Sequence, residues 1–140
     1  MVLELVSGRT LDEHVLSQPN GRLLESEAVR IASDLAEALA FCHRAGLAHL
    51  DVKPSNAIVG GAHNTTLIDY GASATFDASR PPSTQWVDLS VGTENFMSPE
   101  RQFEEYEHIL GPPADVYSLG CVVFFMLFGA PPYDWEGANT

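Results

Sequence analysis

HLDVKPSN, at residues 49–56, holds a carboxylate, an ammonium group and an amide close together. The segment follows a helix-like stretch and precedes a strand-like one, so we expect it to form a loop. Thirteen residues after Asn56, a second carboxylate stands at Asp69, just before a tyrosine and a glycine. Carboxylate and amide oxygens are ligands for Mg²⁺, and a lysine offers a positive point charge to a phosphate. Because Asp51 could orient a hydroxyl group and accept its proton, the pattern indicates phosphate chemistry with a divalent metal.

Further segments extend the pattern in both directions along the chain: VLELV at residues 2–6, GTENFMSPE at 92–100 and DVYSLG at 115–120. In this order, the segments resemble the motifs of eukaryotic-type protein kinases. Residues 49–56 resemble the catalytic loop H-R-D-x-K-x-x-N, and residues 69–71 resemble the D-F-G metal motif. Residues 92–100 are similar to the substrate-docking loop that ends in A-P-E, and 115–120 to the start of the central helix. Residues 2–6 look like the last inner strand and the hinge.

The resemblance implies a role for each matching residue. Asp51 would be the catalytic base, and Lys53 would steady the transferring phosphoryl group. Asn56 and Asp69 would hold Mg²⁺, so ATP and Mg²⁺ are the implied cofactors. The hinge and an apolar floor would meet the adenine of ATP through Leu3, Glu4, Val6, Ala57 and Ile58.

The remaining matches would position these groups. His49 and Tyr70 would stack in the internal spine, and Gly71 would be the glycine of the metal motif. Asp115 would support the catalytic loop from below. Thr93 and Glu100 would belong to the substrate loop. Thr93 would bridge toward Asp51 and Lys53.

The implied fold is α+β and protein-kinase-like, with a mostly helical large (C-terminal) lobe that is incomplete. Residues 1–140 would be a partial kinase domain, from the hinge through the central helix. A glycine-rich phosphate loop and its strand lysine do not occur in these residues, so we expect the small N-terminal lobe to be missing. The sequence stops shortly after the segment that resembles the central helix, so we also expect the end of the large lobe to be missing.

The implied function is a protein serine/threonine kinase that transfers the γ-phosphoryl group of ATP to protein hydroxyls. By the same resemblance, Lys53 favours serine and threonine over tyrosine as the target. The residues of the motifs at 52–56 and 92–101 are similar to those of the MAP kinase kinase and kinase-kinase-kinase branch. The alternative is a truncated pseudokinase that serves as a binding or scaffold module. The four polar residues Asp51, Lys53, Asn56 and Asp69 favour a catalytic parent, because a scaffold does not need them all.

Composition excludes several other classes of protein. The chain carries 7 Lys plus Arg against 19 Asp plus Glu, a formal net charge of −12, which argues against nucleic-acid or anionic-lipid surfaces as partners. Cys42 and Cys121 lie in apolar stretches, so we expect buried thiols in a reducing compartment. The longest apolar run, residues 119–130, is shorter than the roughly twenty residues of a membrane span. These observations predict a soluble, cytoplasmic protein without a membrane span.

Hydrophobic periodicity predicts the elements that carry the motifs. We expect a short helix capped by Thr10 and a long helix that begins at an N-cap Ser26 and stops at Gly46. Apolar residues recur along the long helix at spacings of three and four, namely Val29, Ala32, Leu35, Ala36, Leu39 and Cys42. Residues 115–128 are expected to form a helix that is apolar on every side and therefore buried. Residues 2–6 are expected to end a strand, and residues 57–59 and 66–68 to form a hairpin. Residues 71–97 have no clear period and are expected to be a functional loop.

Leu50 departs from the kinase pattern, because most of these kinases carry an arginine there that receives a phosphate from the activation segment. We therefore expect phosphorylation of that segment, at Ser83, Thr84 or Ser90, to matter little. The acidic run at residues 104–107 is expected to be a solvated helix face. The histidines outside the catalytic loop have no metal-ligand spacing and are expected to lie on the surface or to be hydrogen-bonded, namely His14, His43, His63 and His108.

Overall fold

The structure is a computed structural model that describes residues 4–62, 64–77, 79–80, 92–102 and 111–133. Several residues singled out in the sequence lie outside these ranges, namely Leu3, His63, His108, the acidic run at 104–107 and the hydroxyl residues Ser83, Thr84 and Ser90.

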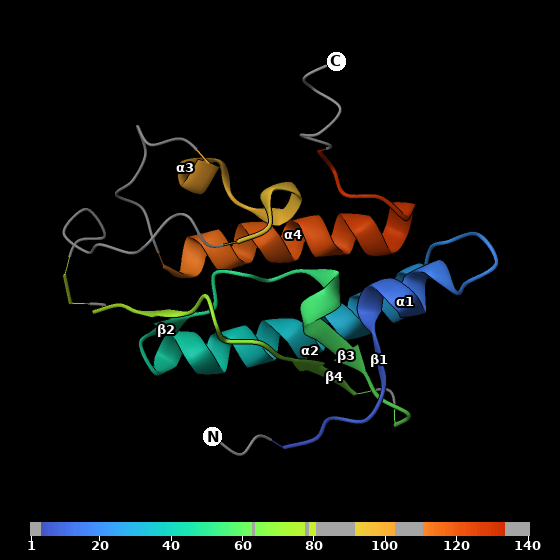
Figure 1. The fold of residues 1–140 in the computed structure, drawn as a ribbon, viewed down its shortest axis with the longest axis horizontal. Coiled ribbons are helices and arrows are strands. Elements are labelled where there is room, and N and C mark those ends of the chain that lie inside the picture. Colours follow the sequence, from blue (N-terminus) through green and yellow to red (C-terminus); the bar gives the residue numbers. More distant parts are fainter. Residues whose placement is uncertain (1–3, 63, 78, 81–91, 103–110, 134–140) are drawn as a thin grey trace.

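Two long helices, α2 (Glu25–Arg44) and α4 (Pro112–Phe128), pack against each other through the middle of the fold (Figure 1). The main hydrophobic core lies between them and extends to a short helix, α1 (Leu11–Leu16), and a small sheet. A second small core cluster contains Ala48, Leu50 and Ala114. Helices dominate and the strands are short, so the structure confirms the expected α+β class.

Helix α2 buries three of the six residues that its periodicity predicted, namely Leu35, Leu39 and Cys42. The buried face also contains Ala28 and Ile31, whereas Val29 is 62% exposed. Its N-terminus was predicted wrongly, because the helix begins at Glu25 with Leu24 as the N-cap, and Ser26 lies inside the first turn. Two glutamates in that turn, Glu25 and Glu27, interact favourably with the positive end of the helix dipole. They stabilise the start of the helix although no side chain caps it. At the other end the helix stops as expected, with Gly46 at a left-handed φ of 74°.

The three-stranded sheet carries the floor of the candidate site. Its order is β1 (Arg9–Thr10), β3 (Ala57–Val59) and β4 (Thr65–Leu67), all antiparallel. The predicted hairpin is confirmed, with its second strand one residue earlier than expected. Thr10 is the N-cap of α1, also as expected, and its amide donates to Glu13 Oε2 at 3.1 Å. Residues 4–6 are irregular rather than the predicted strand.

Short elements interrupt the segment predicted as a loop over residues 71–97. Strand β5 (Ala74–Thr75) pairs with β2 (Leu47–Ala48), and a 3₁₀ turn covers Glu94–Phe96. Helix α3 (Pro99–Gln102) follows this turn. Another 3₁₀ turn, Pro54–Asn56, lies earlier in the chain, within the catalytic-loop segment. These pieces are too short to show a period in the sequence.

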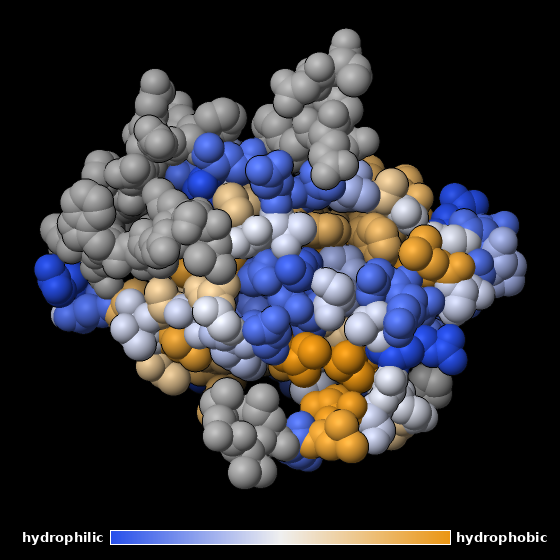
Figure 2. Space-filling model, in the orientation of Figure 1, coloured by the Kyte–Doolittle hydropathy of each residue, from blue (hydrophilic) through white to orange (hydrophobic). Residues whose placement is uncertain are grey.

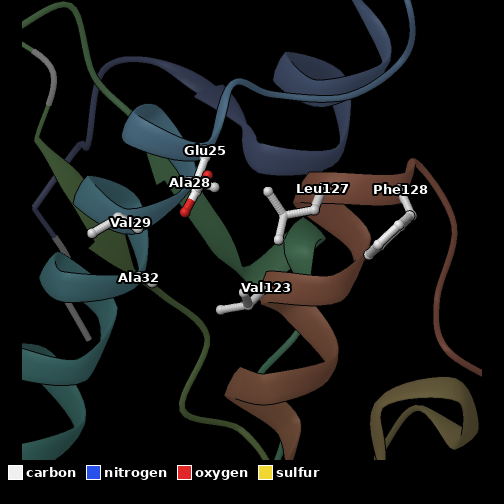
Figure 3. A pocket seen from close by; sticks show the side chains of 7 residues that line it. All are labelled: Glu25, Ala28, Val29, Ala32, Val123, Leu127 and Phe128. Carbon is white, nitrogen blue, oxygen red and sulfur yellow. The ribbon is translucent and has the colours of Figure 1, made fainter.

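Helix α4 begins at Pro112, three residues before the predicted start, because proline is well tolerated in a first helical turn. It ends as predicted at Gly129, which has a φ of 77°. The prediction that α4 is buried on every side was wrong, since Phe128 is 62% exposed. Phe128 lines an apolar groove of about 450 Å³ between α2 and α4, where Val29 and Ala32 face Val123 and Leu127 (Figure 3). In the part of the chain that the structure describes, no helix is long and apolar enough to cross a membrane.

Candidate catalytic site

The catalytic-loop segment, residues 49–56, crosses between α2 and α4 on its way from β2 to β3 (Figure 1). Hydrophilic surface gathers at the centre of this face (Figure 2). The side chain of Asp115, at the start of α4, supports the segment and is completely buried. Its carboxylate accepts hydrogen bonds from the backbone amides of His49 and Leu50, each at 2.8 Å. Such charge-assisted bonds hold the loop backbone in place, including Leu50 at an unusual φ of 64°.

His49 connects three parts of the site from a fully buried position. Its Nε2 lies 3.0 Å from the carbonyl oxygen of Ile68, and its Nδ1 accepts from the amide of Asp51 at 3.2 Å. These two bonds fit one tautomer, with the proton on Nε2. Its ring also meets Tyr70 edge-on, with centroids 4.8 Å apart, so the predicted packing of this pair is observed.

Four side chains form one hydrogen-bonded network around Asp51. Lys53 Nζ lies 3.0 Å from Asp51 Oδ2 and donates to Thr93 Oγ1 at 2.7 Å. Thr93 in turn donates to Asp51 Oδ1 at 3.2 Å. Asn56 Nδ2 donates to both the backbone oxygen and Oδ2 of Asp51, at 2.9 and 3.0 Å. The structure therefore brings together the candidate base, the lysine, the amide and the substrate-loop threonine.

Asp69 reaches the same region through the β3–β4 hairpin. The amide of Ile68 donates to the carbonyl of Asn56 at 2.8 Å, so Asp69 follows directly after a residue tied to Asn56. Asp69 has a φ of 60°, and its Oδ1 accepts from the amide of Gly71 at 3.1 Å. A turn of this kind is a strained conformation for a residue other than glycine, and such residues concentrate at functional sites.

The donor atoms fit Mg²⁺ held by a nucleotide. Asn56 engages Asp51 through its nitrogen, so the amide oxygen, the atom that suits Mg²⁺, is not used in those bonds. Asp69 is exposed and adds a carboxylate. Among the described residues, no group of three His, Cys, Asp or Glu could hold a metal by itself. The site thus matches a metal bound through one or two protein groups and phosphates, as Mg²⁺ usually is.

Tyr70, which stands where the family motif has phenylalanine, finds a partner for its hydroxyl. Cys42 of α2 lies with its sulfur 3.7 Å from Tyr70 Oη. Partial burial, with a smaller contribution from Cys42, raises the pKa of Tyr70 to about 12. The tyrosine is therefore neutral at physiological pH, and it links the metal motif to the long helix.

The residues assigned to the adenine pocket are only partly brought together. Ile58 lies in β3 opposite Thr10 of β1, and Ala57 beside it is buried. The segment that contains Glu4 and Val6 is irregular, and Leu3 lies outside the described residues. Of the other predicted positions, Gly71 is exposed and Glu100 lies half-buried in α3. The hinge role of residues 3–6 stays a prediction.

Two residues of the site were missed or undervalued in the sequence. His43, near the end of α2, places its Nε2 2.7 Å from Asp115 Oδ2, so it belongs to the support of the loop. Arg101 of α3 is buried and donates through Nη1 to the carbonyl of Leu50. The sequence offered a signal for neither contact, because partners 72 and 51 residues apart have no fixed spacing in a motif.

Comparison with known proteins agrees with this geometry. Residues 1–140 match the family model for the protein kinase domain. The chain is 35% identical over 135 residues to CBL-interacting protein kinase 4 of Oryza sativa subsp. japonica, covering 96% of this chain and 29% of that protein. It is 34% identical over 134 residues to serine/threonine-protein kinase PknB of Mycobacterium leprae, covering 95% and 20% of the two chains.

The chain thus spans between a fifth and a third of the length of these relatives. The family is shown by the match along all 140 residues, and protein kinases as a family use ATP and Mg²⁺. The match and the arrangement around Asp51 lead to the same conclusion, that this chain belongs to the protein kinase family.

Proposed function

We propose that these residues belong to a protein serine/threonine kinase that transfers the γ-phosphoryl group of ATP to hydroxyl groups of protein substrates. The observation that carries the proposal is the network in which Asp51 contacts Lys53, Asn56 and Thr93. A carboxylate held in this way beside an ammonium group can orient a hydroxyl and accept its proton.

Each residue has a defined part in the proposed reaction. Asp51 accepts the proton as the substrate oxygen bonds to the γ-phosphorus and the bond to the β-phosphate oxygen breaks, leaving ADP. Lys53 lies where it can offset the charge of the moving phosphoryl group. Asn56 and Asp69 would hold Mg²⁺, which neutralises charge on the phosphates when bound. Thr93, bonded to both Asp51 and Lys53, couples the substrate loop to these groups.

We propose that residues 1–140 form part of a larger kinase domain, from the hinge to the central helix. The greater length of the relatives supports this division. Residues 3–6 and 57–58 would then line one wall of the adenine site. The named relatives are serine/threonine kinases, which supports this target over tyrosine, and the likeness to the MAP kinase kinase branch stays a prediction.

Two free, buried thiols, Cys42 and Cys121, support an intracellular location for the protein. No observation favours the pseudokinase alternative, since the groups that a kinase needs for proton transfer and metal binding are present around Asp51. A scaffold role is therefore not proposed.

The test is phosphoryl transfer by the complete kinase domain that contains these residues. Labelled ATP, Mg²⁺ and a generic serine/threonine substrate should give product, and Asp51→Asn should abolish it, because the amide cannot accept the proton. Equal turnover by the parent and by Asp51→Asn, with contaminating kinases removed, would falsify the assignment of Asp51 as the base.

A further inference from the structure

Leu50 lies in a small apolar cluster that has no place for a charged, phosphate-binding side chain. Its side chain is 2% exposed and packs with Ala48 and Ala114, against which Ala74 and Phe76 also lie. A charged side chain in that cluster would lose its hydration without gaining a partner. The catalytic loop of this chain therefore presents apolar carbon at the position where most of these kinases carry an arginine.

Arg101 of α3 brings a guanidinium group to the same loop. It is 5% exposed and donates through Nη1 to the backbone carbonyl of Leu50. Burial lowers the pKa of Arg101, and the negative charges of Asp115, Asp51 and Glu100 act against that shift. An arginine keeps its charge in such surroundings.

The substrate loop passes close to this guanidinium at Gly92. A Cβ atom there would lie 3.3 Å from Arg101 Nη2 and 3.4 Å from Nη1. Gly92 also has a φ of 144°, which side chains rarely adopt, so the approach requires glycine. Arg101 thus lies between the start of the substrate loop and the backbone of the catalytic loop.

We propose that Arg101, which directly follows the substrate loop (residues 92–100), is a positioning residue that fastens this loop to the catalytic loop at Leu50. It supplies from α3 the cation that most of these kinases place within the catalytic loop. The partner of the guanidinium in this contact is a backbone carbonyl rather than a phosphate. The proposal rests on the proposed function, because what Arg101 positions is Asp51 and Thr93 for phosphoryl transfer.

The position of Arg101 explains how one residue can act on both sides of the network. Its carbonyl partner, Leu50, directly precedes Asp51, and the same segment that carries Arg101 carries Thr93. Removing the guanidinium leaves a buried carbonyl without its donor and frees the substrate loop next to it. We expect this change to disturb the alignment of Asp51 with Thr93 and to have a smaller effect on nucleotide binding.

The test compares Arg101→Ala, Arg101→Lys and Arg101→Gln in the complete kinase domain. The control is Arg44→Ala, an exposed arginine at the end of α2. We expect Arg101→Ala to lower kcat by at least about tenfold while KM for ATP changes by less than about threefold. Arg101→Lys should recover much of kcat, and Arg44→Ala should resemble the parent. A fall in kcat that lysine does not rescue any better than glutamine would overturn the proposal, as would an unchanged kcat in Arg101→Ala.

Hydrogen exchange supplies a measurement that does not need activity. In Arg101→Ala, amides in residues 92–102 and at Leu50 and Asp51 should exchange faster, while the middle of α2 keeps its protection. If Arg101→Ala does not fold, the same comparison is made between Arg101→Lys and Arg101→Gln. An inactive parent that shows this exchange pattern would defeat the proposed function and leave the positioning role standing. An active parent with unchanged exchange at residues 92–102 would defeat the positioning role alone.

Discussion

The buried carboxylate of Asp115 accepts three hydrogen bonds, from the amides of His49 and Leu50 and from the ring of His43. Asp115→Ala would leave these donors, of which the two amides are buried, without an acceptor, so we expect a loss of about 3–5 kcal/mol of stability. Denaturant unfolding of the complete domain measures this loss. The exposed Glu37→Ala on α2 serves as the control and should change stability by less than about 0.5 kcal/mol. A loss for Asp115→Ala as small as that of the control would contradict the supporting role.

Asp69 and Asp51 should fail in different ways when each is changed to asparagine. Asp69→Asn removes a charge from the proposed metal site, so we expect weaker binding of Mg·ATP together with lower turnover. Asp51→Asn should leave nucleotide binding nearly intact. Calorimetric titration of Mg·ATP into both variants separates the two roles. Identical affinities for the two variants would show that Asp69 does not reach the metal.

At the scale of residues, the motifs predicted the groups that carry chemistry better than the groups that hold them. Asp51, Lys53 and Asn56 lie within six residues, so their spacing alone indicated that they meet. The contact between Arg101 and Leu50 depends on how α3 folds back on the catalytic loop, which no local pattern records. His43 looked like an ordinary histidine near a helix end until α4 placed Asp115 beside it.

The C-terminus of α4 depends on a glycine in the left-handed conformation. Gly129 has a φ of 77°, and a Cβ there would lie 2.5 Å from the backbone oxygen of Gly21. We expect Gly129→Ala to lower the stability of the domain by about 2–4 kcal/mol, from the unfavourable φ and the clash together.

Gly120, in the middle of the same helix, is the matched control. An added Cβ there meets no heavy atom within 4 Å, and alanine is a better helix former than glycine. Gly120→Ala should therefore leave stability unchanged or raise it by up to about 1 kcal/mol. Thermal unfolding of both variants tests the pair, and equal losses in the two would show that the C-cap conformation is not what matters.

The activation segment should tolerate changes at its hydroxyl residues. Because Leu50 offers no cation and Arg101 is already bonded to the loop, alanine or glutamate at Ser83, Thr84 or Ser90 should change kcat only modestly, within about threefold. Steady-state kinetics of each variant in the complete domain provides the measurement. If one alanine removes nearly all activity and phosphorylation restores it in the parent, another cation must receive the phosphate.

Among the elements, those with a long period were predicted correctly and those set by tertiary contacts were not. The 3.6-residue spacing predicted helix α2 and its buried residues Leu35, Leu39 and Cys42, whereas its first residue, Glu25, depends on the path of the chain before it. Strands β2 and β5 contain two residues each and exist only because they pair with one another. Their sequences carry no alternation that could be detected.

As a whole, the 140 residues by themselves are expected to be inactive and prone to associate. They contain no glycine-rich phosphate loop, and apolar side chains such as Val29, Phe124 and Phe128 are exposed. We expect no measurable phosphorylation and weak or absent ATP binding, tested by calorimetry and a generic serine/threonine substrate. Light scattering should show association. A monomer that unfolds cooperatively and binds Mg·ATP tightly would contradict this expectation.

The hydrogen bonds that the amides of His49 and Leu50 donate to Asp115 join residues that are 66 and 65 positions apart in the sequence. During synthesis on the ribosome, the catalytic loop emerges long before the carboxylate that orders it. The nascent chain can form α2 early, since its hydrogen bonds are local. The loop must wait for the first turn of α4, and until then its amides face water. The catalytic loop of the nascent chain therefore becomes ordered only after the 65 residues that follow Leu50 have been added.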